Sequence, residues 1–272
     1  MLHVLRFAHV FIFFNLFAGR RDIPLWSFLA SFLIAIIGAA GGIGRVLVDE
    51  LIANGINIIA LDLPKSLSAH PLKCSSIPID VLDSDSINLA TRIVRGMDVE
   101  LDGLVNLAGY TKGVRPLVEI DLAAFDDTIM GNLRGVFTST RALLPLMAKN
   151  ASVVTVASGL AQSIRPGHGA YAMAKAGIIA MTKTLAIEEA PRIRVNAVAP
   201  GPVQTAFLTG GTGVSNEDQA SIIDVRKMAS ATPLGRIAIP TDVTGPIRFL
   251  LSKQSGFMTG QVLWINGGAY MP

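Results

Sequence analysis

Residues 33–44 read LIAIIGAAGGIG, an apolar run followed by a glycine-rich turn, and this stretch decides the fold of the chain. A helix-like stretch follows at 43–54, with Gly55 at the position of a helix C-cap. Glycines let the backbone approach phosphate groups, and the N-terminus of a helix favours an anion, so the stretch predicts a pyrophosphate site. The residues expected to face it are Gly38, Gly42, Ile43 and Gly44. The spacing is GxxxGxG rather than GxGxxG, and packing alone can also explain a glycine-rich turn.

Short apolar runs alternate with longer helical stretches along the rest of the chain. The predicted strands are 33–37, 56–61, 76–79, 103–107, 152–156, 193–198 and 262–265. They are continuously apolar, as strands buried on both faces of a parallel sheet are. The predicted helices are 43–54, 84–97, 122–149, 171–189 and 241–252, the second capped by Asp83 or Ser84 and the last by Thr241. This alternation predicts an α/β fold: a single-domain, doubly wound (Rossmann-type) parallel sheet with helices on both faces.

Residues 206–231 interrupt this rhythm and contain three glycines, at 210, 211 and 213. A long irregular segment inside a compact domain is usually functional, so we expect a mobile substrate lid over the site. No repeat or Pro/Gly linker divides the body. We therefore expect residues 32–272 to form one dinucleotide-binding catalytic domain.

The composition excludes several classes of function. Apolar residues make up 51% of the 272 residues and charged residues only 16%, which suits a large core rather than a disordered chain. Residues 1–26 carry a charge of +2, which leaves 20 basic against 19 acidic residues in the remainder, so we expect no nucleic-acid partner. The single cysteine, Cys74, cannot form an internal disulfide, and the four histidines lack metal-ligand spacing. We expect no bound metal.

Residues 1–31 form an apolar N-terminal arm whose role the sequence leaves open. Residues 7–19 are strongly apolar, and Arg20 and Arg21 follow them. Thirteen helical residues rise about 20 Å, which is short of the roughly 30 Å hydrocarbon core of a membrane. Three readings remain: an anchor at a membrane surface, an arm packed on the body or on a partner subunit, or an extension from a mis-set gene start. We expect a cytoplasmic protein, with membrane association through residues 1–31 as the alternative.

Asp62 is the second feature of the predicted dinucleotide site. It stands at the end of the second predicted strand, eighteen residues after Gly44. A carboxylate there can accept both ribose hydroxyls of an adenosine and would repel a 2′-phosphate. Leu63 and Pro64 follow it, where a cation would favour that phosphate. The position therefore predicts NAD rather than NADP, with a solvated aspartate at a strand end as the alternative.

Further motifs follow in order along residues 32–270. They are Asp80-Val81, Asn106-Leu107-Ala108-Gly109, Asn132, Ser158, Tyr171 with Lys175, the loop Pro200 to Thr205, and the Gly-Gly close at Gly267-Gly268. With the glycine-rich turn, this order and spacing resembles the single-domain branch of the short-chain dehydrogenase/reductase family. The resemblance implies a nicotinamide cofactor, with Asp80 at the adenine and the Pro200 loop at the nicotinamide carboxamide. It also implies a homotetramer or homodimer.

The resemblance carries over to named residues. It implies a cofactor site made of Gly38, Gly42, Ile43, Gly44, Asp62, Asp80, Val81, Asn106, Ala108, Gly109, Tyr171, Lys175, Pro200, Gly201, Val203 and Thr205. The catalytic residues that it implies are Asn132, Ser158, Tyr171 and Lys175. Two positions depart from the family pattern, because Ile37 stands for the usual Thr and Leu107 for the second Asn. We expect weaker local hydrogen bonding there, and no loss of binding.

The chemistry of hydride transfer explains why these residue types suit such a site. Reduction of a carbonyl leaves an alkoxide, and Tyr171 can protonate it if the pKa of the phenol falls from about 10 towards neutrality. Lys175, four residues on, shares a helix face with Tyr171 and favours the phenolate. Ser158 can donate to the substrate oxygen, and the resemblance implies that Asn132 holds a water that relays protons to Lys175. Each residue alone is more commonly structural; their joint occurrence indicates catalysis.

The sequence thus predicts an NAD(H)-dependent oxidoreductase that interconverts a secondary alcohol and a ketone, with Tyr171 as the acid/base. The alternatives are a 3-oxoacyl-thioester (acyl-carrier-protein) reductase, a membrane-tethered reductase of a lipid-like or steroid-like substrate, and a non-catalytic nucleotide-binding scaffold. Arg165 and His168 lie between Ser158 and Tyr171, as candidates for substrate contact or as parts of a solvated loop. The expected partner is a small-molecule alcohol or ketone.

Overall fold

The computed structural model describes residues 32–111, 113–209 and 224–272. The predicted N-terminal arm, 1–31, and residues 210–223 of the predicted lid lie outside the described residues, so what the sequence predicts for them stays a prediction. Phe32–Pro272 form one structural unit.

Seven parallel strands form one sheet in the order β3-β2-β1-β4-β5-β6-β7. Their bounds are β1 Leu33–Ile37, β2 Asn57–Asp62, β3 Ser75–Pro78, β4 Leu101–Asn106, β5 Met147–Val156, β6 Ile193–Pro200 and β7 Val262–Ile265. The strand order reverses direction between β1 and β4, as in a doubly wound sheet, where ligands bind beyond the carboxyl ends of the strands. The predicted fold class is confirmed.

The central strand β1 is buried on both faces, which explains its continuous apolar run. Ile34 and Ile36 pack into a core with residues of α2 and α9, whereas Ala35 and Ile37 pack into a second core on the opposite face of the sheet. Successive side chains of a strand point to opposite faces, so a strand between two helical layers needs apolar residues at every position.

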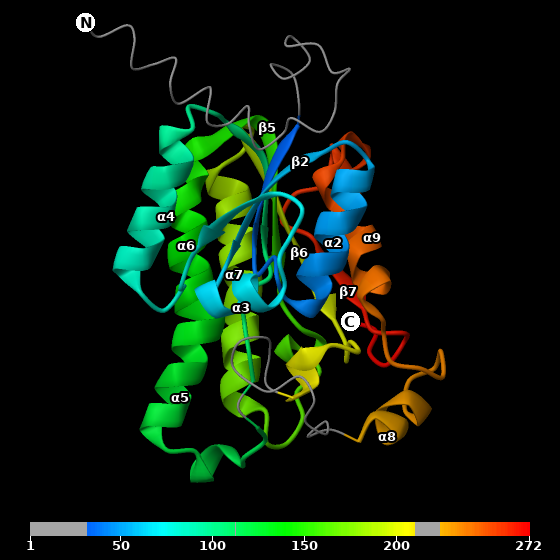
Figure 1. Cartoon of the computed structure of the whole chain (residues 1–272). Helices are drawn as coiled ribbons and strands as arrows, with labels where there is room; N and C mark the ends of the chain where they lie inside the picture. The colour runs from blue at the N-terminus through cyan, green and yellow to red at the C-terminus, as the bar shows by residue number, and fades with distance from the viewer. Residues whose placement is uncertain (1–31, 112, 210–223) are drawn as a thin grey trace, which may run out of the picture. The chain divides into compact units, whose positions relative to one another are not determined.

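Helices cover both faces of the sheet (Figure 1). On one face, α2 (Gly42–Ala53) packs against α9 (Pro240–Leu251). On the other face, α4 (Ser84–Gly96), α6 (Gly135–Leu143) and α7 (Gly169–Glu188) lie side by side. The two helical layers therefore cover both faces of β1, and the carboxyl end of β1 leads into the glycine-rich turn.

The helix predicted over 122–149 is wrong beyond residue 143. The observed path is α5 (Leu122–Ile129), a π-helical segment at Met130–Arg134, α6, and a 3₁₀ turn at Leu144–Leu146. Pro145 lies in that turn, where its missing N–H and fixed φ end the helical hydrogen bonds. The chain then enters β5 at Met147, which pairs with Leu101 of β4.

Two further details differ from the sequence prediction. The last helix is not capped by Thr241: its N-cap is Ile239, Pro240 occupies the first helical turn, and Asp242 accepts a hydrogen bond of 2.8 Å from the Ile239 N–H. A proline is favoured at this position because the first helical N–H groups have no partner within the helix. Two short helices, α3 (Pro64–Ala69) and α8 (Val225–Ser230), were not predicted. Asp83 does cap α4, through the Asp85 N–H at 2.9 Å.

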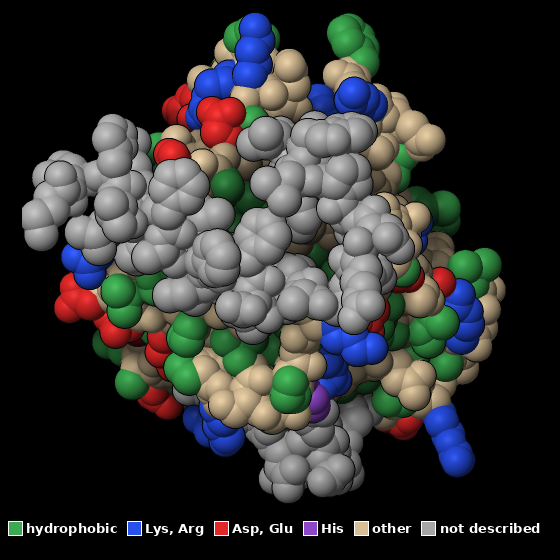
Figure 2. Space-filling view, turned by 45° about the horizontal axis from the view of Figure 1, so that its top comes forward, with side chains coloured by type: hydrophobic (Ala, Val, Ile, Leu, Met, Phe, Trp, Pro, Cys, Tyr) green, Lys and Arg blue, Asp and Glu red, His purple; other side chains and the backbone are tan. Residues whose placement is uncertain are grey.

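The described surface carries both signs of charge. On the face shown in Figure 2, Lys and Arg side chains are interspersed with Asp and Glu and with hydrophobic groups. In the described part of the chain, no helix has both the length and the apolar character needed to cross a membrane.

Candidate active site

A cavity of about 370 Å³ lies at the carboxyl ends of β1, β4, β5 and β6. Most of the residues singled out from the sequence line it. They are Gly38, Gly42, Ile43, Gly44, Asp62, Asp80, Val81, Ala108, Gly109, Ser158, Tyr171, Lys175, Pro200, Gly201, Val203 and Thr205. Arg165 and His168 line it as well, whereas Asn106 and Asn132 do not. The fold thus brings together residues that are far apart in the sequence.

The glycine-rich turn has the shape of a phosphate cradle. Gly38 has a φ of +81°, which side chains rarely tolerate. A Cβ on Gly44 would overlap the carbonyl oxygen of Gly38 and stand 2.6 Å from that of Ala39. Helix α2 begins without a side-chain cap and without an acidic residue in its first turn, so its first N–H groups remain for an anion. These features fit the pyrophosphate of a dinucleotide.

Asp62 ends β2 and is bonded into this turn. Its Oδ2 accepts from the Ala40 N–H at 2.8 Å and its Oδ1 from the Leu63 N–H at 2.7 Å. Burial raises the pKa of the Asp62 carboxyl, and these hydrogen bonds offset part of that rise. The same carboxylate lines the cavity. The carboxylate therefore stands at the place where the sequence predicts contacts with a ribose.

Asp80 and Val81 follow β3 at the same end of the cavity. Asp80 Oδ1 accepts from the Leu82 N–H at 2.9 Å, and its own N–H donates to the Ser86 hydroxyl at 2.8 Å. These contacts hold the Asp80 side chain in place on the cavity wall.

The opposite end of the cavity contains Ser158, Tyr171 and Lys175. Ser158 follows β5, and its side chain is hydrogen-bonded to Tyr171 of α7. The Lys175 Nζ lies 5.7 Å from the centroid of the Tyr171 ring and donates to the Val156 carbonyl oxygen at 2.9 Å. The i, i+4 spacing on α7 thus places both side chains beside the end of β5, as the sequence predicts.

Burial shifts both titrating groups. It lowers the pKa of Lys175 to about 8. It raises the pKa of Tyr171, and the hydrogen bond with Ser158 offsets only part of that rise. The sequence-based expectation of a lowered Tyr171 pKa is therefore not met by these protein groups, because desolvation disfavours the phenolate more than the hydrogen bond favours it. A further positive charge near the phenol is needed to lower its pKa.

Asn132 lies in the π-helical segment between α5 and α6 and is fully buried. Its Oδ1 accepts from the Tyr110 N–H at 3.1 Å, and its Nδ2 donates to the Thr128 carbonyl oxygen at 3.1 Å. A Cβ on Gly109 would stand 2.8 Å from Asn132 Oδ1 and 3.3 Å from Lys175 Nζ. Asn132 therefore lies behind the cavity wall, separated from Lys175 by the glycine.

Asn106, the last residue of β4, is also buried behind the wall. Its Nδ2 donates to the hydroxyls of Ser139 and Thr140 on α6, at 3.0 Å each, and its Oδ1 accepts from the Ala108 N–H at 3.2 Å. These bonds tie the end of β4 to α6. Any effect of Asn106 on a ligand would therefore act through the position of Ala108.

The loop from Pro200 to Thr205 is held by a neighbouring segment. The Ala238 N–H donates to the Pro202 carbonyl oxygen at 2.9 Å, and the Gln204 N–H donates to the Ala238 carbonyl oxygen at 2.8 Å. The side chain of Thr205 lies against Gly42, where a Cβ would come within 2.6 Å of Thr205 Cγ2. This loop and the glycine-rich turn therefore meet across the cavity.

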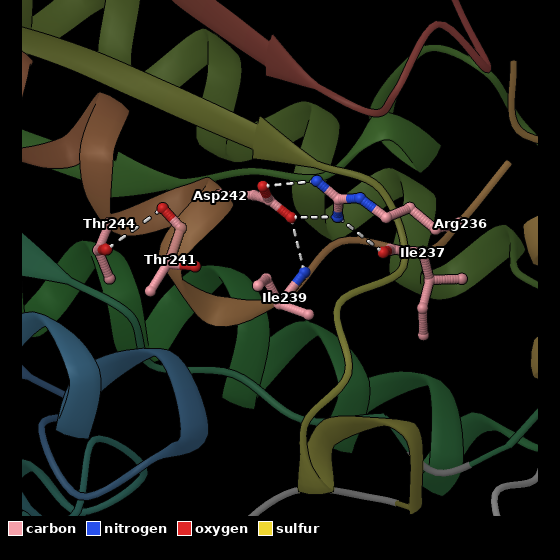
Figure 3. A network of polar contacts seen from close by, with 6 residues as sticks. All are labelled: Arg236, Ile237, Ile239, Thr241, Asp242 and Thr244. Carbon is pink, nitrogen blue, oxygen red and sulfur yellow. Dashed lines mark hydrogen bonds and ion pairs between the residues drawn. The ribbon is translucent and has the colours of Figure 1, made fainter. Parts of the chain in front are cut away.

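An ion pair between Arg236 and Asp242 joins the segment that contains Ala238 to α9 (Figure 3). Arg236 Nη1 and Nη2 bind the two carboxylate oxygens of Asp242 at 2.6 and 2.9 Å. Arg236 also donates to the Ile237 carbonyl oxygen at 3.1 Å, and Asp242 accepts from the Ile239 N–H. The Arg236 guanidinium lowers the pKa of Asp242 to about 2.

Three aromatic residues of the cavity wall were missed. Tyr110 directly follows Gly109, which was the available signal, and its hydroxyl donates to the Asp127 carbonyl oxygen at 3.0 Å. Phe207 belongs to the predicted lid, and its ring centroid lies 6.0 Å from that of Tyr171. Tyr270 follows β7 and has no local sequence signal. Its ring centroid lies 5.6 Å from that of Trp264 in β7.

Comparisons with known proteins find relatives over most of the chain. A family model described as enoyl-(acyl carrier protein) reductase matches residues 38–270. The 3-oxoacyl-(acyl-carrier-protein) reductase FabG of Thermotoga maritima is 38% identical over 244 residues, which cover 86% of this chain and 95% of that protein. The short-chain type dehydrogenase/reductase y4vI of Sinorhizobium fredii is 36% identical over 245 residues, but this chain spans only 43% of its length.

A solved structure extends the likeness to three dimensions. The 3-ketoacyl-(acyl-carrier-protein) reductase of Brucella melitensis, crystallised with NADH, has a TM-score of 0.78 at 26% identity, covering 89% of this chain and all (100%) of that one. The motifs, the sheet order and these relatives agree: the chain belongs to the short-chain dehydrogenase/reductase family.

Proposed function

We propose that this oxidoreductase interconverts a secondary alcohol and a ketone with NAD(H), and that Tyr171 is its acid/base. The observation that carries the proposal is the grouping of Ser158, Tyr171 and Lys175 in a cavity that also contains the glycine-rich turn and Asp62. A nucleotide scaffold without catalysis needs the turn and Asp62 but has no use for the other three residues.

Each of these side chains has a task in proton transfer. When a ketone accepts a hydride at its carbonyl carbon, its oxygen gains charge, and the Tyr171 hydroxyl transfers its proton to that oxygen. Ser158 donates a hydrogen bond to the same oxygen and stabilises the developing charge. The Lys175 ammonium stabilises the phenolate that Tyr171 becomes, and Asn132 orients the backbone around the lysine. In the oxidation of an alcohol, the same steps run backwards.

The proposed cofactor is NAD, which would accept or donate the hydride and, when oxidised, would supply a positive charge. Gly38, Gly42, Ile43 and Gly44 would hold its pyrophosphate, and Asp62 its adenosine ribose. The NADH complex of the Brucella reductase is consistent with this choice. A comparison of kcat/KM with NADH and NADPH tests it, because a preference for NADPH would overturn the assignment.

Replacement of Tyr171 by Phe tests the catalytic role. We expect kcat to fall by at least ~10²-fold, the low end for acid/base catalysis, while NADH still binds. Tyr110→Phe is the matched control, since Tyr110 also lines the cavity but its hydroxyl is bonded to the Asp127 carbonyl oxygen. Near-normal turnover of Tyr171→Phe would remove the proposed mechanism. Absence of turnover in the parent chain as well would favour the scaffold.

A second candidate is reduction of a 3-oxoacyl thioester, the reaction named for the Thermotoga and Brucella relatives. It uses the same carbonyl chemistry, so only the substrate distinguishes it from the first. Assays with a simple ketone, a 3-oxoacyl thioester and an enoyl thioester separate the possibilities. We expect no reduction of the enoyl double bond, because Ser158 and Tyr171 are arranged to bind and protonate an oxygen.

The remaining expectations concern assembly and location. We propose a homo-oligomer and a cytoplasmic enzyme that acts on small molecules. A membrane-tethered reductase remains the alternative, and it depends on residues 1–31, which lie outside the described residues. Sedimentation velocity on the purified full chain gives the oligomeric state.

A further inference from the structure

The cavity has opposite charges at its two ends. Among the described residues that line it, the carboxylates are Asp62 and Asp80, both at the dinucleotide end. The described cationic and imidazole side chains that line it are Lys175, Arg165 and His168, at the Tyr171 end. Lys175 is buried and its ammonium donates to the Val156 carbonyl oxygen. Of these cations, the exposed Arg165 is therefore the one that a substrate can reach.

The backbone around Arg165 is held in place. The Arg115 N–H donates to the Gly167 carbonyl oxygen at 3.0 Å, and the His168 N–H donates to the Arg165 carbonyl oxygen at 3.3 Å. Gly167 has a φ of +82°, and Val114 packs so closely on it that a Cβ there would overlap the valine side chain. The turn that carries Arg165 and His168 is therefore fixed against the segment that follows β4, on the cavity wall.

The Arg165 guanidinium has no hydrogen-bonded or ionic partner within the described part of the chain, although four other arginines, at 115, 192, 236 and 248, each pair with a carboxylate. Burial lowers the pKa of His168, and the charge of Arg165 in the same turn lowers it further, which favours the neutral imidazole. An unpaired guanidinium beside a neutral imidazole is an arrangement that receives an anion.

Apolar side chains form part of the same cavity wall. Leu160, Phe207, Leu208 and Met228 line the cavity together with Tyr171. A substrate that places its carbonyl at Ser158 and Tyr171 and also reaches Arg165 would have these apolar side chains available for its apolar portion.

We propose that the substrate carries an anionic group, a carboxylate or a phosphate, which Arg165 binds at the mouth of the cavity while the carbonyl lies at Tyr171. This inference rests on the proposed function and narrows its substrate class. Arg165 acts through binding alone: a forked, charge-assisted pair lowers KM for anionic substrates and takes no part in hydride or proton transfer.

Matched substrates test the proposal with the full-length enzyme and NADH. A series of straight-chain oxo acids is compared with their methyl esters, and a 3-oxoacyl coenzyme A thioester with the N-acetylcysteamine thioester that lacks its phosphates. We expect the parent to prefer one anionic substrate over its neutral partner by roughly tenfold in kcat/KM, the size of a charge-assisted hydrogen bond that stays partly solvated. Preference for the acid identifies a carboxylate, and preference for the coenzyme A thioester identifies a phosphate.

Arg165→Gln should bring that ratio close to one, mainly through KM, and Arg165→Lys should retain part of it because the charge remains. Arg95→Gln is the matched control, since it removes the same charge from the exposed end of α4, away from the cavity, and should keep the parental ratio. The proposal is overturned if the parent shows no preference for either anion, or if Arg165→Gln keeps the parental ratio.

Calorimetry separates this inference from the proposed function. If no substrate is turned over, the proposed function fails, and the binding of the same acid and ester pairs to the NADH complex then decides the inference. Tighter binding of the anion that is lost in Arg165→Gln supports an anion site. Equal binding of anion and neutral partner rejects it.

Discussion

The carboxylate of Asp62 accepts a 2.8 Å hydrogen bond from the backbone N–H of Ala40, which joins the end of β2 to the glycine-rich turn. One side chain therefore both shapes the phosphate turn and stands where an adenosine ribose is expected. We therefore expect the selection of the cofactor and the geometry of the turn to be coupled through this residue.

Asp62→Ala should raise KM for NADH roughly tenfold, since hydrogen bonds to a charged group contribute about 1.5–3 kcal/mol. It should also lower KM for NADPH, because the charge that repels a 2′-phosphate is gone. Steady-state kinetics with both cofactors measure the change. If NADPH gains nothing, Asp62 holds the turn without selecting the cofactor.

Gly44→Ala should weaken NADH binding at least roughly tenfold, because relief of an overpacked contact costs about 1–3 kcal/mol and the turn must move. The contacts of the new Cβ would be the carbonyl oxygens of Gly38 and Ala39. Gly41→Ala is the matched control: its Cβ would meet only the Gly38 carbonyl oxygen, at 3.3 Å, and its φ of −71° suits alanine. NADH fluorescence titration gives both affinities. Equal losses in the two variants would contradict the steric argument.

Lys175→Met should abolish turnover and yet stabilise the fold. The fall of the Lys175 pKa from 10.5 to about 8 corresponds to about 3 kcal/mol of unfavourable burial at pH 7. The variant loses the hydrogen bond to the Val156 carbonyl oxygen, which contributes about 1 kcal/mol. The free energy of unfolding should therefore increase by about 2 kcal/mol in the variant. Because the folded pKa lies below the unfolded one, the unfolded chain binds more protons between pH 8 and 10.5. The stability of the parent should therefore rise with pH across this window, relative to that of Lys175→Met.

Urea denaturation at several pH values measures this difference. As the pH rises through the window, the parent should first close the gap to the variant and then become the more stable of the two, because a neutral lysine keeps only the favourable bond to Val156. A variant that is less stable than the parent at pH 7 would show that the ammonium is better satisfied than its burial indicates.

The Arg236–Asp242 pair should affect the cofactor site from a distance. It holds the segment that contains Ala238, whose backbone is hydrogen-bonded to Pro202 and Gln204. Arg236→Gln should raise KM for the cofactor more than it lowers kcat, and lower the melting temperature by at most about 3 °C, as expected for an exposed pair. Arg236→Lys should recover part of the loss.

The pH dependence of the same pair provides a second check. The pKa of Asp242 is about 2, below its ordinary 3.8, so its stabilisation is complete above pH 3.8 and is lost as the pH falls towards 2. The difference in stability between the parent and Arg236→Gln should shrink over that range. A difference in stability that does not change with pH would show that Arg236 stabilises the fold through packing and not through its charge.

The apolar arm can be tested by fractionation of the full-length protein after gentle lysis. We expect it in the high-speed supernatant, because the apolar run of thirteen residues at 7–19 is too short to span about 30 Å of hydrocarbon as a helix. Recovery in the membrane pellet that resists high salt would instead support an anchor. An inert soluble protein expressed in parallel controls for trapping in the pellet.

Sequence reasoning succeeded where a local pattern has one structural solution. Gly38 and Gly44 mark a turn that only glycine can form, and the spacing of Tyr171 and Lys175 puts both on one face of a helix. The continuous apolar run of β1 indicates a strand covered on both faces.

The sequence could not predict features that depend on packing between distant segments. Pro145 was a local signal for the end of α6 at Leu143, but the start of β5 at Met147 depends on its pairing with Leu101 of β4, which an apolar periodicity does not show. The pKa of Tyr171 depends on how many groups exclude water from it.

The sequence by itself therefore determined the fold class and the family, and it named many of the residues that line the cavity, because glycine turns, strand ends and helix spacing are set locally. Only the tertiary structure decided that Asn106 and Asn132 lie behind the wall, that Tyr270 lies on it, and that Arg165 faces it without a partner in the described chain. Those outcomes depend on contacts between residues far apart in the chain, and no local sequence pattern encodes them.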